Sequence, residues 1–196
     1  FPLGRTLHTY AQILRDGRFI PYTLTLCVAQ AGFFAYIAGS SSVFISHYAL
    51  SPTQFSLLFA LNAVGLVVAA IINPLVHARL GVLTTFRVVN SAYFVVLALL
   101  LGAMLAGVTH LAVLCGGLFV AVTLLGLLMP TGSQLAMQQQ GAVAGTASAL
   151  LGSLQFGFGA VITAVSGALA HHGGLGLVAV MAGCAALSAL MCLLLL

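Results

Sequence analysis

Residues 141–166 read GAVAGTASALLGSLQFGFGAVITAVS and contain no charged side chain. Drawn as a helix at about 100° per residue, this stretch has one face of small residues and another of bulky apolar residues. Helices of soluble proteins separate polar from apolar side chains, whereas this one separates small from large. The pattern indicates a transmembrane helix whose large residues face lipid and whose small residues admit a neighbouring helix. The small face holds Gly145, Ala149, Gly152, Gly159, Thr163 and Ser166, with Phe156 interrupting it, and the bulky face holds Leu150, Leu151, Leu154, Phe158, Val161 and Val165.

The composition of the whole chain is typical of an integral membrane protein. Of its 196 residues 62% are hydrophobic and 3% are charged, which is too few charges to keep a soluble domain dissolved. We therefore predict an all-α bundle of membrane-spanning helices. The five arginines are too dispersed to indicate nucleic-acid binding, and the four cysteines lie apart in apolar runs, as small buried hydrophobic residues do. We expect no cofactor.

Six apolar segments are each long enough to cross the roughly 30 Å hydrocarbon core of a bilayer. A helix start precedes the second, because Ser51 can cap the helix, Pro52 fits its first position and Gln54 can complete a capping box. Pro130 is predicted to end the fourth segment. The predicted spans are residues 19–45, 52–76, 88–106, 111–129, 141–169 and 175–196, and on the second span Asn62, Gly65, Ala69 and Asn73 share one face.

The arginines fall in two groups that are separated by an even number of spans. Arg5, Arg15 and Arg18 precede the first span, and Arg79 and Arg87 lie between the second and the third. Both groups are therefore on the same side of the membrane, and the positive-inside rule assigns that side to the cytoplasm. We expect a multi-pass protein with both ends of this chain in the cytoplasm.

Residues 1–18 are predicted to form a cytoplasmic amphipathic segment, because apolar residues recur in them at helical spacing. An ordinary loop is the alternative. Since the chain begins with phenylalanine instead of methionine, we expect it to be a piece of a longer protein, with residues 19–196 as its six-span transmembrane domain. The recurring apolar residues of the first segment are Leu3, Leu7, Tyr10 and Leu14.

Several short sequences match a known transporter family. Over essentially its whole length the chain resembles the Bcr/CflA group of drug/proton antiporters in the major facilitator superfamily, and AGTASALLG at residues 144–152 is the most specific match. The resemblance implies the C-terminal six-helix half of a major facilitator fold, built as two inverted three-helix repeats. The other matching pieces are FFAYIAG from Phe33, Ser51-Pro52 with Phe55, FALNAVG from Phe59, Asn73, Arg79-Leu80-Gly81, Phe86-Arg87 and FGFGA from Phe156.

The resemblance also implies a function, the export of small amphipathic compounds across a bacterial inner membrane in exchange for protons. The implied partners are the lipid bilayer, those compounds, protons and a missing N-terminal six-helix half. The turn with Arg79, Gly81 and Arg87 resembles a second copy of the facilitator loop motif without its acidic residue, which favours a structural role. Because no span contains a carboxylate, we expect the proton-coupling residue in the missing half.

Weakly polar and aromatic side chains in the spans are candidates for binding the exported compounds. A cavity that accepts varied amphipathic molecules needs aromatic surface and a few hydrogen-bonding amides. The same amides could instead bond helix to helix. The candidates are Gln30, Phe33, Phe34, Asn62 and Gln155, with Tyr36 beside them, whereas Gly145, Ala149, Gly152 and Gly159 are predicted to pack helices.

Other function classes fit the sequence less well. His171 and His172 are neighbours on a short turn and cannot build a four-ligand metal site alone, so we expect no metal. The chain has neither a GxSxG sequence nor a pair of acids, and we do not expect an enzyme. Two alternatives to efflux stay open, namely a facilitator that imports a small nutrient or metabolite and a truncated remnant without transport.

Overall fold

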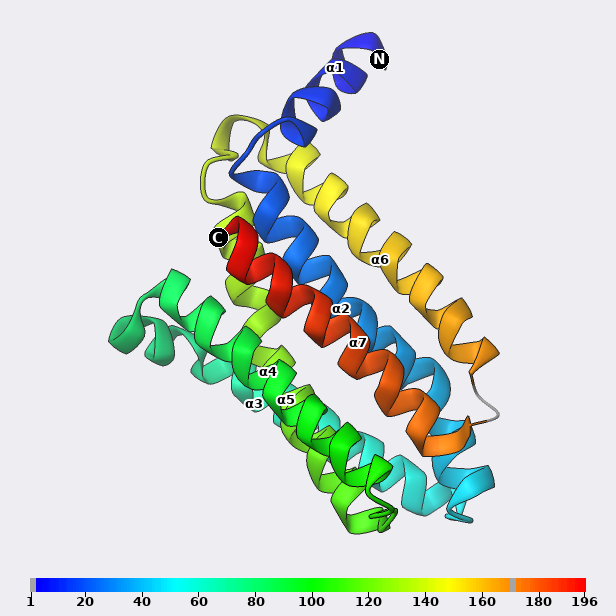
Figure 1. The fold of residues 1–196 in the computed structure, drawn as a ribbon. Helices are drawn as coiled ribbons and strands as arrows, with labels where there is room; N and C mark the ends of the chain where they lie inside the picture. The colour runs from blue at the N-terminus through cyan, green and yellow to red at the C-terminus, as the bar shows by residue number, and fades with distance from the viewer. Residues whose placement is uncertain (1–2, 170–171) are drawn as a thin grey trace.

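The computed structural model describes residues 3–169 and 172–196, which form helices joined by short connections and contain no strand. A π-helical turn, η1, extends the first long helix, and a 3-10 turn, η2, precedes the fifth (Figure 1). The elements are α1 (Leu3–Leu14), α2 (Phe19–Ser41), η1 (Ser42–His47), α3 (Pro52–Leu80), α4 (Val82–Leu105), α5 (Leu111–Met137), η2 (Gly141–Val143), α6 (Ala144–Ala168) and α7 (Gly173–Leu195).

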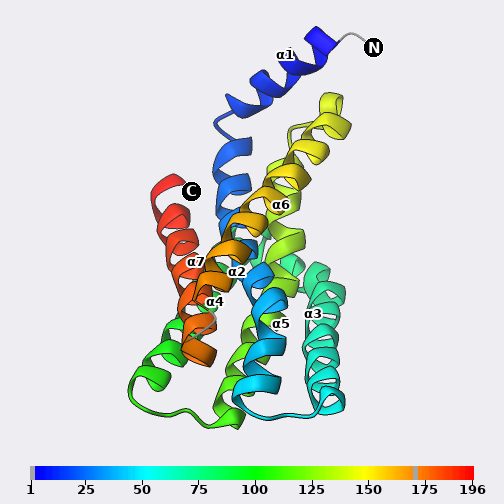
Figure 2. The same ribbon diagram turned by 90° about the vertical axis from the view of Figure 1, so that its right-hand side faces the viewer.

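Among the described residues, six helices are long and apolar enough to cross a membrane, namely α2 with η1 and α3 to α7. Successive long helices run in opposite directions, and α1 extends away from one end of the bundle (Figures 1 and 2). α2 lies against α5, α6 and α7, and α5 also lies against α3 and α4. α2 and α5 are therefore the central helices, with α3 and α6 on opposite flanks (Figure 1). The predicted six-span helical bundle is confirmed.

The four residues predicted to share one face of α3, Asn62, Gly65, Ala69 and Asn73, are the buried residues of this helix. α5 packs on this face at very short range. A Cβ atom on Gly126 of α5 would overlap the carbonyl oxygen of Leu66 and lie 2.9 Å from the Cβ of Ala69. Glycine at this position therefore allows the backbones of α3 and α5 to approach each other.

The small face predicted on α6 is packed only in part within the described residues, since Gly159 and Ser166 are buried. Gly145 and Ala149 are exposed, and a Cβ atom on Gly145 or Gly152 would meet no heavy atom of the described residues within 4 Å. Gly159 does pack as predicted, since a Cβ there would lie 2.5 Å from the ring of Phe34 on α2. The buried residues of α6 are Ala147, Leu151, Gly159 and Ser166. At 100° per residue, the centre of this buried face is rotated about the helix axis by about 80° from the centre of the predicted face. This rotation buries Leu151, which was predicted to face lipid.

Three helices are clearly longer than predicted, and one of them is α4, which begins at Val82 instead of residue 88. α3 continues to Leu80, so Gly81 is the single residue between α3 and α4, and its φ of 79° is one that glycine adopts without strain. α5 continues past Pro130 to Met137. The proline removes one backbone donor, but the Thr131 hydroxyl lies 2.6 Å from the carbonyl oxygen of Leu127 in the same turn and helps to satisfy the local backbone.

The segment before α2 is fixed to the connection between α5 and α6. Arg18 Nη1 donates to Gln139 Oε1 over 2.6 Å, and Asp16 Oδ2 accepts from Gln140 Nε2 over 2.6 Å. The backbone N–H of Arg18 also donates to Asp16 and is the main cause that lowers the pKa of its carboxyl group. Asp16 is therefore charged at neutral pH, and its contribution to stability is lost only as the pH falls through this lowered pKa.

The start of α3 has the predicted capping box. Ser51 Oγ accepts from the backbone N–H of Gln54 over 3.2 Å, and Gln54 Oε1 accepts from the backbone N–H of Ser51 over 2.9 Å. We expect Ser51→Ala to lower the free energy of unfolding by about 1 kcal/mol, because it leaves a helix N–H without a partner. Thermal unfolding of the purified protein measures this. Ser46→Ala, at an exposed serine of η1, is the control, and an equal loss in both variants would contradict the assignment.

Candidate functional site

The first candidate group lies between α2 and α6, near the middle of both helices. The Gln30 side chain of α2 is 7% exposed, and its Oε1 atom has no hydrogen-bond partner among the described residues. α2 and α6 run in the same direction (Figure 1), and Phe34 of α2 contacts Gly159 of α6. Gln30 precedes Phe34 by one helical turn, and Gln155 precedes Gly159 by one turn, so Gln30 and Gln155 lie at the same level of the two helices. Gln155 is half-buried. The structure thus brings both predicted glutamines to one interface.

Aromatic rings lie beside this pair of glutamines. The ring centroids of Phe34 and Phe156 are 5.6 Å apart at an interplanar angle of 59°. Phe156 is 68% exposed, so it presents most of its ring outward from α6. Phe156 was not among the predicted binding residues. The side of α2 that faces α6 therefore combines an unpaired buried acceptor with aromatic surface, as an amphipathic ligand would require.

The second candidate group lies between α2 and α3. Asn62 Nδ2 donates to the hydroxyl oxygen of Tyr36 over 2.7 Å, and both side chains are buried. The Tyr36 ring stacks with the ring of Phe33 at a centroid distance of 6.1 Å and with the ring of Phe59 at 5.7 Å. Phe59 was not among the predicted site residues, although it stands one helical turn before Asn62 in the matching FALNAVG sequence. The Asn62 amide therefore forms a hydrogen bond between two helices, because its partner Tyr36 is on α2. Such a bond was the alternative to a role in ligand binding.

A polar cluster that the sequence analysis did not identify joins α3 to α5. His77 Nε2 lies 2.9 Å from Thr131 Oγ1, and Thr131 Oγ1 lies 3.1 Å from Asn73 Oδ1. Asn73 and Thr131 are buried, and His77 is half-buried. The second span was predicted to end at residue 76, but α3 continues to Leu80, so this imidazole belongs to the helix. The cluster ties the two helices together at the end of the bundle that carries the arginines.

The turn that resembles a facilitator loop motif lies at this same end of the bundle. Arg79 and Arg87 are exposed on either side of Gly81. Arg87 Nη2 donates to the carbonyl oxygen of Leu196, at the end of α7. Within the described residues no group of three or more His, Cys, Asp or Glu side chains could hold a metal ion, and His171 lies outside those residues.

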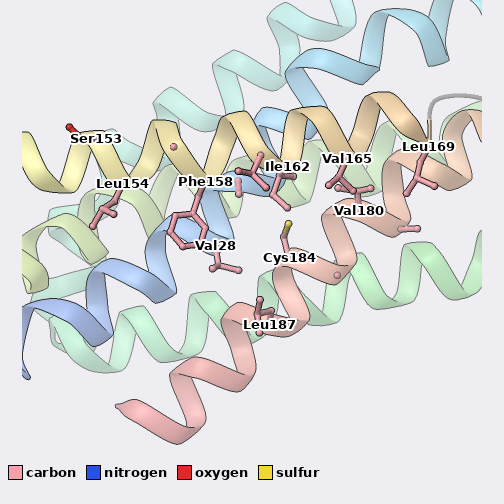
Figure 3. Close-up of a pocket in the computed structure, with 15 residues that line it drawn as sticks. Val28, Ser153, Leu154, Phe158, Ile162, Val165, Leu169, Val180, Cys184 and Leu187 are labelled. Atoms are coloured by element: carbon pink, nitrogen blue, oxygen red, sulfur yellow. The ribbon is translucent and has the colours of Figure 1, made fainter. Parts of the chain in front are cut away.

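A large hollow of about 710 Å³ lies elsewhere, between α6 and α7 over the outer side of α2 (Figure 3). Phe158 and Ile162 of α6 point into it toward Val28 of α2 and Cys184 of α7 (Figure 3). Its walls are almost wholly apolar, and none of the five predicted binding residues lines it. A site for a drug-like molecule places a few polar groups among apolar ones, so this hollow is not the predicted binding site.

Comparison with known proteins bears on the fold. The chain is 31% identical over 170 residues to a Bacillus subtilis (strain 168) protein described as "Uncharacterized MFS-type transporter YdgK". The match covers 84% of this chain and 41% of that protein, so the chain spans about two fifths of the length of its relative. No family model matches the chain, and no solved structure matches it significantly. The chain belongs to the major facilitator superfamily and forms half of its fold.

Within this major facilitator half, the structure divides the predicted site residues between two interfaces of α2. Gln30, Phe34 and Gln155 gather where α2 meets α6, whereas Phe33 and Asn62 lie where α2 meets α3. The first group holds the unsatisfied acceptor, and the second is already internally bonded. The interface of α2 with α6 is therefore the better candidate for ligand recognition.

Proposed function

We propose that this major facilitator half belongs to a multidrug efflux transporter of the bacterial inner membrane, related to the Bcr/CflA drug/proton antiporters. The proposal rests on the unpaired Gln30 oxygen, because leaving a buried acceptor unbonded costs about 1–3 kcal/mol unless a ligand pairs with it. The exported compounds are small and amphipathic, with an apolar or aromatic body and at least one N–H or O–H donor. The donor bonds Gln30 Oε1, and the body lies against Phe34 and Phe156. Gln155 completes the proposed lining at this interface, whereas Phe33 and Asn62 lie at the interface of α2 with α3.

The proposed transporter needs a second six-helix half, on which the exposed small face of α6 would pack. Gly145, Ala149 and Gly152 leave open space on that face, and small residues of this kind permit close helix contact in membranes. The relative extends well beyond the match, which leaves room for such a half. The missing half supplies the carboxylate for proton coupling, and the arginine-bearing end of the bundle faces the cytoplasm.

Ethidium efflux from bacteria that express the full-length protein tests this function. We expect expressing cells to extrude ethidium faster than cells with an empty vector, and an uncoupler of the proton gradient to abolish the difference. Efflux that is absent or insensitive to the uncoupler would contradict the drug/proton assignment. Proton-driven accumulation of a nutrient would favour an importer, and a start codon close to Phe1 would favour the transport-inactive remnant.

A further inference from the structure

The hollow between α6 and α7 extends over one half of the membrane span. On α6 its lining begins at Ser153 and Leu154, near the middle of the helix, and reaches Leu169 just beyond its end. At about 1.5 Å per residue, the distance from Leu154 to Leu169 is roughly 22 Å. This end of α6 lies opposite the arginine-bearing end of the bundle (Figure 1). The hollow is therefore a lengthwise groove in the membrane half away from the arginines.

The chemistry of the groove wall restricts what can occupy it. No charged residue lines it, and the hydroxyl of Ser153 already donates to the carbonyl oxygen of Ala149 over 2.8 Å. A ligand in the groove would therefore find almost no hydrogen-bond partner. A hydrocarbon chain has no hydrogen bonds to lose in this groove, whereas a polar molecule would lose its hydrogen bonds to water without gaining others.

The groove is continuous with apolar surface that the described chain leaves uncovered. Val161 and Val165 on one wall are 64% and 43% exposed, and Leu187 on the other is 50% exposed. At 100° per residue, Leu154 and Val161 point about 180° away from Gly145 and Gly152. The face of α6 proposed to contact a second half is thus opposite the groove, so lipid is the neighbour on the groove side.

We propose that one acyl chain of a phospholipid, from the membrane leaflet opposite the arginines, occupies this groove as a bound component of the protein. The chain separates α6 from α7, which touch each other little, and fills space that no side chain of the described residues fills. Its headgroup lies beyond Leu169, where the exposed His47 and His172 supply polar surface. This lipid site is independent of the proposed drug site around Gln30.

Two glycines in the groove wall make the proposal testable without disturbing the fold. Gly157 of α6 and Gly183 of α7 both line the groove, and a Cβ on either would meet no heavy atom of the described chain within 4 Å. Gly183→Leu therefore places a side chain in the path of the groove and leaves the helix packing in place. Gly102→Leu adds the same side chain at an exposed, equally open position of α4 and is the matched control.

The experiment uses the full-length protein in vesicles that contain phosphatidylglycerol with a photoactivatable group in one acyl chain, and mass spectrometry maps the labelled peptides. We expect labelling concentrated on the walls at Leu154–Leu169 and Ala179–Leu187. It should fall by at least about fivefold in Gly183→Leu, because the added side chain obstructs the groove where an acyl chain would lie, and stay unchanged in Gly102→Leu. Even labelling of all exposed helices, labelling unaffected by Gly183→Leu, or a groove left unlabelled because the second half covers it would each overturn the proposal.

Discussion

Replacing Gln30 by methionine is expected to reduce ethidium efflux by at least about tenfold without lowering thermal stability. The two side chains have nearly the same shape, so the substitution removes the buried acceptor and keeps the packing between α2 and α6. A hydrogen bond from substrate to a buried, otherwise unpaired acceptor contributes about 1–3 kcal/mol, and 1.4 kcal/mol is a factor of ten in affinity. Since Oε1 has no partner in the described chain, its removal should leave the free energy of unfolding equal or higher.

Efflux rates at several ethidium concentrations and the melting temperature of the purified full-length protein measure the two effects together. Gln134→Met, at an exposed glutamine of α5, is the matched control and should change neither. A fall in melting temperature with efflux unchanged would assign Gln30 to helix packing instead. That result would remove the main support for a binding site at the interface of α2 with α6.

The sequence predicted the helices well, because six apolar runs of membrane length have no other stable arrangement in a bilayer. Their ends were less predictable. Pro130 would end a helix in water, but within a packed bundle α5 continues to Met137. Where a helix ends inside a bundle therefore depends on its neighbours as well as on its own residues.

The sequence groups the buried residues of α3 on one face, whereas the face chosen on α6 contains only part of that helix's buried residues. The face of α3 carries amides, Asn62 and Asn73, which avoid lipid, and both are buried. The face of α6 was chosen by residue size, and small residues are compatible with contact to another helix or with open space. Gly145 and Gly152 lie on open space in this chain. Residue size thus identifies a possible contact face but does not name the partner.

The candidate site was predictable as a set of residue types but not as a geometry. Polar side chains in apolar spans are rare enough that Gln30, Asn62 and Gln155 stood out directly. Their pairing did not follow from the sequence, because a hydrogen bond such as the one from Asn62 to Tyr36 depends on how α2 and α3 are rotated. The unsatisfied state of Gln30, which carries the functional proposal, is likewise a property of the packed bundle.

The close approach of α3 and α5 at Gly126 should be sensitive to an added methyl group. We expect Gly126→Ala to destabilise the protein by about 2–3 kcal/mol, because an overpacked interior forces the backbone to shift. The new Cβ would overlap the Leu66 carbonyl oxygen and lie 2.9 Å from the Cβ of Ala69. A backbone oxygen cannot rotate away as a side chain can, so α3 and α5 must separate. Thermal unfolding of the full-length protein in detergent measures the loss.

Gly116→Ala on the same helix is the matched control. A Cβ on Gly116 would meet no heavy atom of the described residues within 4 Å, so alanine there should be neutral or stabilise α5 by up to about 1 kcal/mol through its higher helix propensity. The two variants add the same atom to the same helix and differ only in what that atom meets. Equal melting temperatures would show that the contact between α3 and α5 is looser than the structure has it, and the polar cluster of His77, Thr131 and Asn73 would then lack the close approach that holds it together.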